Sequence, residues 1–162
     1  MTETQSTQTQ RLWLGLLGWL LLCFAVELSG VTFLPGRWYA HLDKASWTPP
    51  SYLFAPIWTM IYIIMGTAAW LVWREGGFRK QSAPLTLFLI QLALNGAWSF
   101  LCFGLHDLLL SVADMLLLWV MLMVTTFRFF AVKAPAGWLM SIYLLWVTFA
   151  FTLNVALWHL NR

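Results

Sequence analysis

The sequence predicts an all-α integral membrane protein, a bundle of five transmembrane helices with a long first loop. Composition is the first observation: 61% of the 162 residues are hydrophobic, only 9% are charged, and the mean hydropathy is +0.76. A soluble domain carries about 25% charged residues, so the bilayer is the expected solvent. The second observation is five apolar runs, each close to the ~20 residues that cross a bilayer as a helix.

The elements follow in order from the breaks between these runs. The polar segment MTETQSTQTQ is expected to be a disordered tail, residues 1–10, ahead of one domain at 11–162. Proline and glycine mark the helix ends, and Pro84 suits the first turn of the third helix. Short connections make consecutive helices antiparallel neighbours, and the loop at 36–50 is the long exception. We expect spans at about 12–34, 52–73, 85–105, 108–127 and 136–160.

Lysine and arginine in the loops predict the orientation. One side of a five-span chain carries six of them, and the other side carries three, Arg37, Lys44 and Arg162. The protein is expected in a bacterial cell membrane. Its N-terminus is therefore expected in the cytoplasm, and the 36–50 loop outside. The six residues of the cytoplasmic side are Arg11, Arg74, Arg79, Lys80, Arg128 and Lys133.

Three tryptophans lie several residues inside the spans, where an interfacial belt does not explain them. Helical spacing places each on a stripe with polar or small neighbours. Because polar groups at membrane depth face the bundle interior, the stripes predict an aromatic-lined cavity. The alternatives are packing of the tryptophans between helices and hydrogen bonds of the polar side chains between helices. The stripes are Gln91, Asn95, Trp98 and Cys102; Trp58, Tyr62 and Met65; and Trp146, Ala150, Leu153 and Asn154.

Glu27 and Asp114 are the carboxylates inside the predicted spans. Such residues serve proton or cation pathways in some membrane proteins, and the alternative is a neutral acid bonded to a neighbouring helix. Cys23 and Cys102 lie in apolar runs without a Cys-x-x-Cys pattern, so no metal site is expected. We also find no nucleophile–base pair and no phosphate-binding glycine loop, and no cofactor is required.

The motif WYAHLDKASWTPP, followed by PIWTMIY, QLALNGAWSFLCFG and YLLWVTFAFTLN, resembles the translocator protein family, also called tryptophan-rich sensory proteins or peripheral benzodiazepine receptors. The resemblance covers about residues 12–160. It implies a five-helix bundle, often dimeric, whose first loop folds over a cavity as a lid. It also implies tetrapyrrole ligands such as protoporphyrin IX and haem, with cholesterol and synthetic isoquinoline or benzodiazepine ligands in some members.

Site residues follow from the same resemblance. Asp114 matches an acidic position in the family's fourth helix, and Trp58 and Trp146 match tryptophans implicated in light-dependent porphyrin breakdown. The lid and the entrance to the second helix correspond to Trp38, Tyr39, Trp47, Pro49 and Pro50. The pocket lining corresponds to Trp58, Tyr62, Asn95, Trp98, Trp146, Phe149, Ala150 and Leu153.

The sequence departs from the family pattern at three places. Ala45 replaces a lid proline. Val155 and His159 stand where the cholesterol motif needs a tyrosine and then a lysine or arginine, which weakens a sterol assignment. Ala93 and Ala97 replace a glycine pair that packs dimers, so a homodimer would rest on this small-residue substitute.

Three functions are therefore considered. The first is a receptor or sensor that binds porphyrin or haem, in tetrapyrrole transport or stress regulation. The second is a light-dependent porphyrin-degrading enzyme that uses Trp58 and Trp146. The third is a proton-coupled secondary transporter that uses Glu27 and Asp114. Membrane lipid is an expected partner, and nucleic acid is not.

Overall fold

The computed structural model describes residues 3–162, and every regular element in that range is helical. Four helical segments are long and apolar enough to cross a membrane: 51–73, 77–104, 108–132 and 134–160. The first helix adds a shorter apolar stretch, Leu12–Leu28. The predicted fold class, a five-helix membrane bundle, is confirmed. The helices are α1 (Glu3–Val31), α2 (Arg37–His41), α3 (Phe54–Trp73), α4 (Gly77–Ser99), α5 (Leu108–Val132) and α6 (Ala134–Leu160), with a 3-10 turn η1 (Ser51–Leu53) and a π turn η2 (Phe100–Gly104).

The helix ends differ most from the sequence prediction at the starts of α1 and α4, and α5 also continues to Val132, five residues beyond the predicted end. Helix α1 begins at Glu3, so residues 3–10 are helical where a disordered tail is predicted; the glutamine and glutamate side chains there are good helix formers. Met1 and Thr2 lie outside the described residues. Helix α4 begins at Gly77, before the expected residue 85, and is kinked at Gln81 (φ −118°, ψ 33°). The kink places Pro84 in the first turn of the straight, membrane-spanning part, where its missing N–H costs little.

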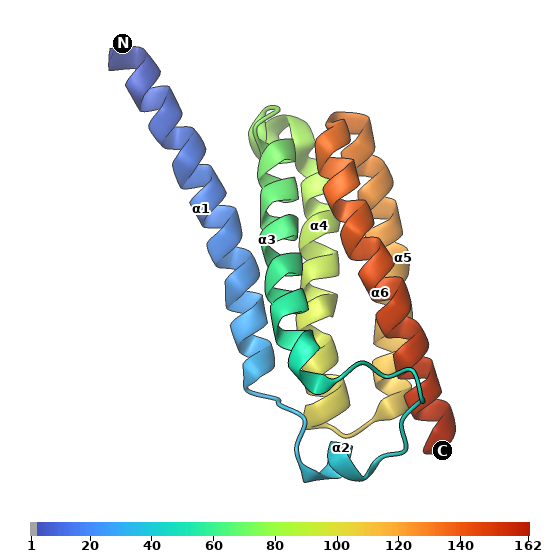
Figure 1. Cartoon of the computed structure of the whole chain (residues 1–162). Coiled ribbons are helices and arrows are strands. Elements are labelled where there is room, and N and C mark those ends of the chain that lie inside the picture. Colours follow the sequence, from blue (N-terminus) through green and yellow to red (C-terminus); the bar gives the residue numbers. More distant parts are fainter. Residues whose placement is uncertain (1–2) are drawn as a thin grey trace.

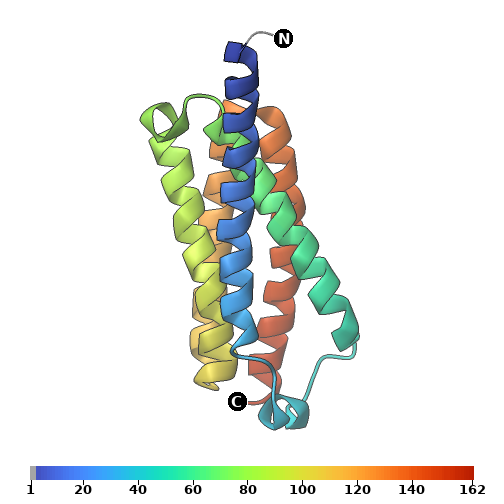
Figure 2. The same cartoon turned by 90° about the vertical axis from the view of Figure 1, so that its left-hand side faces the viewer.

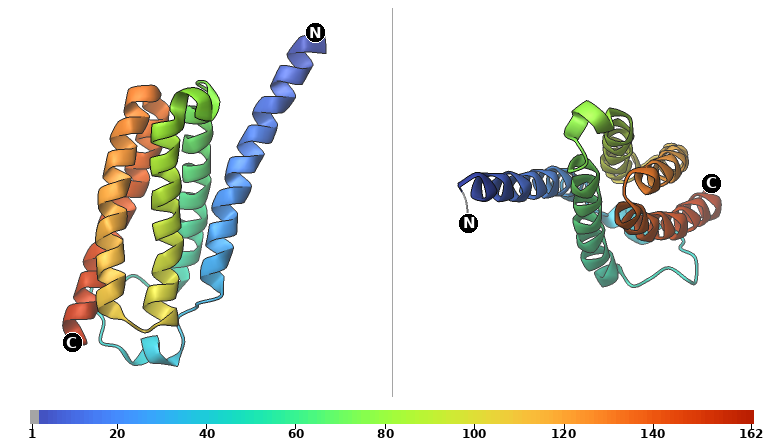
Figure 3. Two further views of the ribbon diagram at one scale, coloured as in Figure 1. Left: turned by 180° about the vertical axis from the view of Figure 1, so that it is seen from behind. Right: turned by 90° about the horizontal axis from the view of Figure 1, so that it is seen from above.

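The helices form a closed bundle with α1 on its outside (Figures 1 and 3). Helix α3 packs against α1, α4 and α6, while α5 packs against α4 and α6. The N-terminal half of α1 leans away from the bundle in Figure 1. Gly66 allows α1 to approach α3 closely, because a Cβ there would lie 3.2 Å from the Leu20 Cα.

Apolar side chains fill the half of the bundle farther from the 36–50 loop. Phe88 on α4 stacks on Phe129 on α5 with ring centroids 5.9 Å apart, and Trp19 of α1 meets Phe88 edge-on at 5.6 Å. At this end, Lys133 and Glu75 form an ion pair of 2.8 Å that joins the two interhelical connections. The hydrogen bond from Lys133, together with its charge, lowers the pKa of the exposed Glu75 carboxyl.

The 36–50 loop crosses the opposite end of the bundle, beside the 105–107 turn and the C-terminus (Figure 2). Three contacts hold this loop, which we call the lid. Trp38 stacks on His106 with ring centroids 4.4 Å apart, and Tyr39 meets Phe103 edge-on at 5.3 Å. Asn161 at the end of α6 supplies the third contact.

The Asn161 side chain pairs with the backbone of Asp43 on both of its polar edges. Its Oδ1 accepts from the Asp43 N–H at 2.9 Å, and its Nδ2 donates to the Asp43 carbonyl at 2.9 Å. The same Nδ2 donates to the Leu157 carbonyl at 2.8 Å, which fixes the amide on α6. The C-terminal helix therefore fastens the lid through one side chain.

The first prediction concerns orientation in the membrane. Because Lys and Arg favour the cytoplasmic side, an alkaline phosphatase fused after Arg162 should be active in a Gram-negative host. The same enzyme fused after Arg79, at the opposite end of the bundle, should be inactive. An inactive C-terminal fusion with an active fusion at Arg79 would reverse the assignment.

The second prediction concerns the lid fastening. Asn161→Ala removes both hydrogen bonds to Asp43, worth about 1 kcal/mol together at a partly exposed site. Amide hydrogen exchange over residues 42–48 should then accelerate roughly fivefold. Arg162→Ala is the matched control, because Arg162 contacts only the Trp158 ring among the interactions described for it, and it should leave exchange unchanged. Equal exchange rates in the parent and Asn161→Ala would show that this amide does not hold the lid.

Candidate functional site

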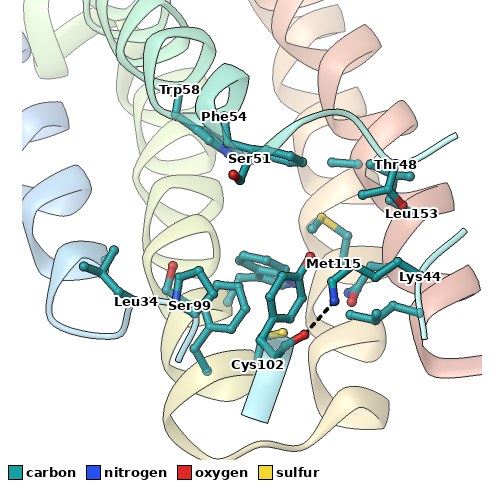
Figure 4. Close-up of a pocket in the computed structure, with 18 of the residues that line it drawn as sticks. Leu34, Lys44, Thr48, Ser51, Phe54, Trp58, Ser99, Cys102, Met115 and Leu153 are labelled. Carbon is teal, nitrogen blue, oxygen red and sulfur yellow. Dashed lines mark hydrogen bonds between the residues drawn. The ribbon is translucent and has the colours of Figure 1, made fainter. Parts of the chain in front are cut away.

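A cavity of about 360 Å³ lies beneath the lid, in the half of the bundle that side chains do not fill (Figure 4). Its walls come from the end of α1, the lid, α3, η2 and the facing sides of α4, α5 and α6. The lining residues are Gly30, Phe33, Leu34, Pro35, Tyr39, Lys44, Ala45, Thr48, Pro49, Ser51, Phe54, Trp58, Trp98, Ser99, Cys102, Phe103, Met115, Ala150, Leu153, Asn154 and Leu157.

Aromatic rings form much of this wall. Trp58 lies on α3 and Trp98 on α4, and Tyr39 faces them from the lid. The π turn η2 brings Cys102 and Phe103 onto the same surface, and Phe103 meets Trp98 edge-on at 5.3 Å. Such an arrangement suits a flat, apolar ligand, since aromatic rings prefer stacked or edge-on neighbours.

Lys44 is the one charged residue among the described lining residues. Its ammonium group donates to the Tyr39 carbonyl at 2.7 Å and to the Leu42 carbonyl at 3.0 Å, and it lies 4.6 Å from the centre of the Tyr39 ring. Burial raises the pKa of the Tyr39 phenol, so this side chain stays neutral beside the lysine. A cation with one N–H left beyond these two carbonyls suits a carboxylate ligand group.

Two further donors belong to lining residues and have no protein partner among the described residues. The Trp98 Nε1 and the Asn154 Nδ2 make no hydrogen bond within the part of the chain that the structure describes. Asn154 is 3% exposed, so its side chain is almost completely covered by the protein.

Six of the fourteen predicted ligand-binding residues line the cavity: Tyr39, Pro49, Trp58, Trp98, Ala150 and Leu153. Trp38 stacks on His106 instead, and Trp47 is 59% exposed and is not among the lining residues. Trp146 lies behind Trp58, with ring centroids 6.3 Å apart, and Phe149 packs on Trp146 at 5.7 Å. Pro50 precedes η1 and is outside the lining.

Tyr62 and Asn95 belong to a buried hydrogen-bond chain above the cavity. The Tyr62 hydroxyl donates to Asn95 Oδ1, and Asn95 Nδ2 donates to the Tyr143 hydroxyl at 2.8 Å. The chain links α3, α4 and α6, and all three residues are buried. The inward direction predicted for Asn95 is therefore found, but its polar atoms are used between helices and do not line the cavity.

The two membrane carboxylates lie outside the cavity and on different helices. Glu27 on α1 accepts a hydrogen bond from Thr59 Oγ1 at 2.9 Å. Asp114 on α5 is half-buried, and its Oδ2 has no partner among the described residues. No hydrogen bond that the structure describes connects them, and both are absent from the lining.

Sequence reasoning did not place Lys44 and Met115 in the site, and it put Asn154 on an inward stripe without naming it as a ligand-binding residue. Lys44 stands inside the WYAHLDKASWTPP motif, where an isolated cation among aromatic residues is a usable signal. Asn154 follows Leu153 on the predicted α6 stripe, but the helical period alone does not tell a lining amide from an interhelical one. Met115 is one apolar residue among many on α5, and nothing in the sequence distinguishes it.

Known proteins of the same kind match nearly the whole chain. The TspO/MBR family model matches residues 19–159. The chain is 42% identical to the tryptophan-rich protein TspO of Chlorobaculum tepidum over 86% of this chain and 91% of that protein. It is 37% identical to the translocator protein of Homo sapiens over 93% of this chain and 92% of that protein. It is 32% identical to the tryptophan-rich sensory protein of Cereibacter sphaeroides over 92% of each chain.

The helical bundle, the aromatic cavity beneath a tryptophan-rich lid and these matches lead to one assignment: the chain is an integral membrane protein of the TspO/MBR family, to which the translocator proteins and tryptophan-rich sensory proteins belong.

Proposed function

We propose that the protein is a membrane receptor for carboxylate-bearing tetrapyrroles such as protoporphyrin IX and haem, which it holds in the cavity beneath the lid. The observation that carries the proposal is the single cation, Lys44, among the described residues that line an otherwise apolar, aromatic cavity. Lys44 supplies positive charge, and the described lining residues include no carboxylate. A porphyrin has the matching chemistry: a flat apolar ring with ionised propionates.

The size of the cavity also supports a small-molecule ligand. Ligand sites commonly measure about 300–1,000 Å³, and this cavity of about 360 Å³ is at the lower end. A macrocycle therefore requires the lid to move outward, and the lid is fastened mainly by side-chain contacts at Trp38, Tyr39 and Asn161. A sterol, whose polar group is one hydroxyl, leaves the Lys44 charge without a counter-ion.

The third prediction tests the role of Lys44. Lys44→Met keeps the length of the side chain but removes the charge, so affinity for protoporphyrin IX should fall about tenfold, the loss expected for one charge-assisted hydrogen bond. Affinity for the uncharged dimethyl ester should change little. Binding is measured by quenching of tryptophan fluorescence in detergent. Arg37→Met is the matched control, because Arg37 lies in the exposed part of the lid and outside the lining.

If Lys44→Met lowers the affinities for protoporphyrin IX and for its dimethyl ester equally, Lys44 supports the lid and does not bind the charged group of the ligand. Failure of the parent protein to bind any porphyrin would refute the proposed function as a whole.

Light-dependent porphyrin breakdown is a second candidate, favoured by the pair of indole rings at the cavity wall. Trp58 lines the cavity, and Trp146 stands edge-on behind it at 6.3 Å. In this reaction the excited porphyrin takes one electron from Trp58, and Trp146 refills the Trp58 radical cation. Dioxygen then adds to the porphyrin radical anion, and the adduct returns one electron to the Trp146 radical cation as the ring opens, so both oxygen atoms end in the product and the tryptophans are restored. The pair forms a short electron relay that leads away from the ligand.

The fourth prediction tests this relay. Trp58→Phe and Trp146→Phe keep an aromatic ring at each position, so most of the porphyrin affinity should remain. Because phenylalanine is much harder to oxidise than tryptophan, both variants should slow the light-dependent loss of the Soret band at saturating porphyrin. Trp138→Phe is the control, since Trp138 is 68% exposed at the opposite end of α6. A Soret band that is stable under light in the parent protein would exclude the activity.

A further inference from the structure

Asn154 carries a buried polar group that the fold leaves unused. The side chain is 3% exposed and lines the cavity, yet its Nδ2 has no partner among the described residues. Some nine in ten buried polar atoms in proteins are hydrogen-bonded, so an unpaired amide N–H₂ group calls for a physical explanation.

The orientation of this amide is fixed from the other side. Asn154 Oδ1 lies 3.2 Å from the Ser111 hydroxyl, and that hydroxyl lies 2.9 Å from the Leu108 carbonyl within α5. The Ser111 hydroxyl has a single proton for these two oxygens, and when it donates that proton to Asn154 Oδ1, the fully buried Ser111 holds the Asn154 carbonyl end toward α5. The N–H₂ end is then the part of the amide that is left for the cavity.

Asn95 shows that burial alone does not produce an unpaired amide here. It is 6% exposed at a comparable depth, and both of its ends are paired, one to Tyr62 and one to Tyr143. Leaving a buried donor without a hydrogen bond costs about 1–3 kcal/mol, and an acceptor atom of a bound ligand removes this cost. The chain therefore has one satisfied asparagine between helices and one unsatisfied asparagine on the cavity.

The rest of the cavity supports a ligand with oxygen acceptors. Trp98 Nε1, on α4, is a second unpaired donor of a lining residue, and Lys44 is a third donor group on the lid. Around Asn154 the lining is apolar, with Met115, Ala150 and Leu153 among its neighbours on the wall. An oxygen atom of the ligand meets the need of Asn154, whereas an alkyl edge leaves its N–H₂ group buried and unpaired.

We propose that Asn154 is a specificity-determining residue, which selects ligands that carry a carbonyl or carboxylate oxygen at their buried edge through a hydrogen bond from its Nδ2. The inference rests on the proposed function, because the ligand is taken to be a tetrapyrrole in this cavity. It differs from the role of Lys44 in one testable respect. Lys44 recognises charge, whereas Asn154 recognises an acceptor oxygen whether it is charged or not.

Three porphyrins separate the two roles. Protoporphyrin IX has ionised carboxylates, its dimethyl ester has neutral carbonyl oxygens, and etioporphyrin has only alkyl substituents on the same ring. Each is titrated into the full-length protein in detergent, with the parent, Asn154→Leu and Asn154→Asp. Asn154→Asp is nearly isosteric and keeps an oxygen for Ser111, but it replaces the donor by an acceptor.

Asn154→Leu should lower the affinities for protoporphyrin IX and for its dimethyl ester about tenfold, and it should leave the affinity for etioporphyrin unchanged or raise it. Asn154→Asp should weaken the acid at least as strongly, because the new carboxylate repels the propionate. Asn95→Leu is the matched control: it removes a buried asparagine that does not line the cavity, so it should lower the unfolding temperature without changing the order of the three affinities.

Equal weakening of all three porphyrins by Asn154→Leu would show a structural role and overturn the inference. Unchanged affinities in both Asn154 variants would do the same, since the donor would then be met by water. Lys44→Met could lower the affinity for protoporphyrin IX alone while both Asn154 variants leave all three affinities unchanged. That result would leave the proposed function standing and remove only this inference. If the parent binds none of the three, both fall together.

Discussion

A polar group inside a bilayer has no water to bond with, so it must find its partner within the protein or in a ligand. That constraint makes the chain helical, because helices satisfy their own backbone. It also explains the buried chain from Tyr62 through Asn95 to Tyr143, which fastens three helices at mid-bundle. The same constraint is left unmet at five side-chain atoms of the described residues: Trp98 Nε1 and Asn154 Nδ2 belong to residues that line the cavity, whereas Gln91 Oε1, Asp114 Oδ2 and Trp146 Nε1 belong to residues outside the lining.

The bundle divides into a packed half and a hollow half, and the lid depends on that division. Stacked rings such as Phe88 and Phe129 fill the half near the Glu75–Lys133 ion pair. In the other half, the lid supplies a wall that the helices do not, through Tyr39 and Lys44. Because side-chain contacts hold the lid, it closes the cavity without being part of the bundle core.

Helical periodicity accounts for the parts of the site that lie on straight helices. The stripes predicted from the sequence place Trp58, Trp98 and Leu153 on the cavity, where the structure also has them. Periodicity gives the face of a helix but not the depth behind it, so Trp146 was expected on the wall and lies one ring behind Trp58.

The lid has no period, and its side-chain directions were beyond sequence reasoning. Both Trp47 and Lys44 are exposed, yet only Lys44 is among the lining residues, although the two are three residues apart. Whether a buried asparagine is paired depends on residues far along the chain: Asn95 meets Tyr143, 48 residues away, while the Nδ2 of Asn154 meets none. The π turn that brings Cys102 and Phe103 to the wall is likewise not signalled by the residues that form it.

The most direct test of the account is an experimental structure of the protein with protoporphyrin IX bound. The account predicts the macrocycle beneath the lid, between Tyr39 and Trp58, with a propionate oxygen within hydrogen-bonding distance of Lys44 Nζ. A porphyrin bound on the lipid-facing surface of the helices, with the cavity closed and unchanged beneath the lid, would contradict it.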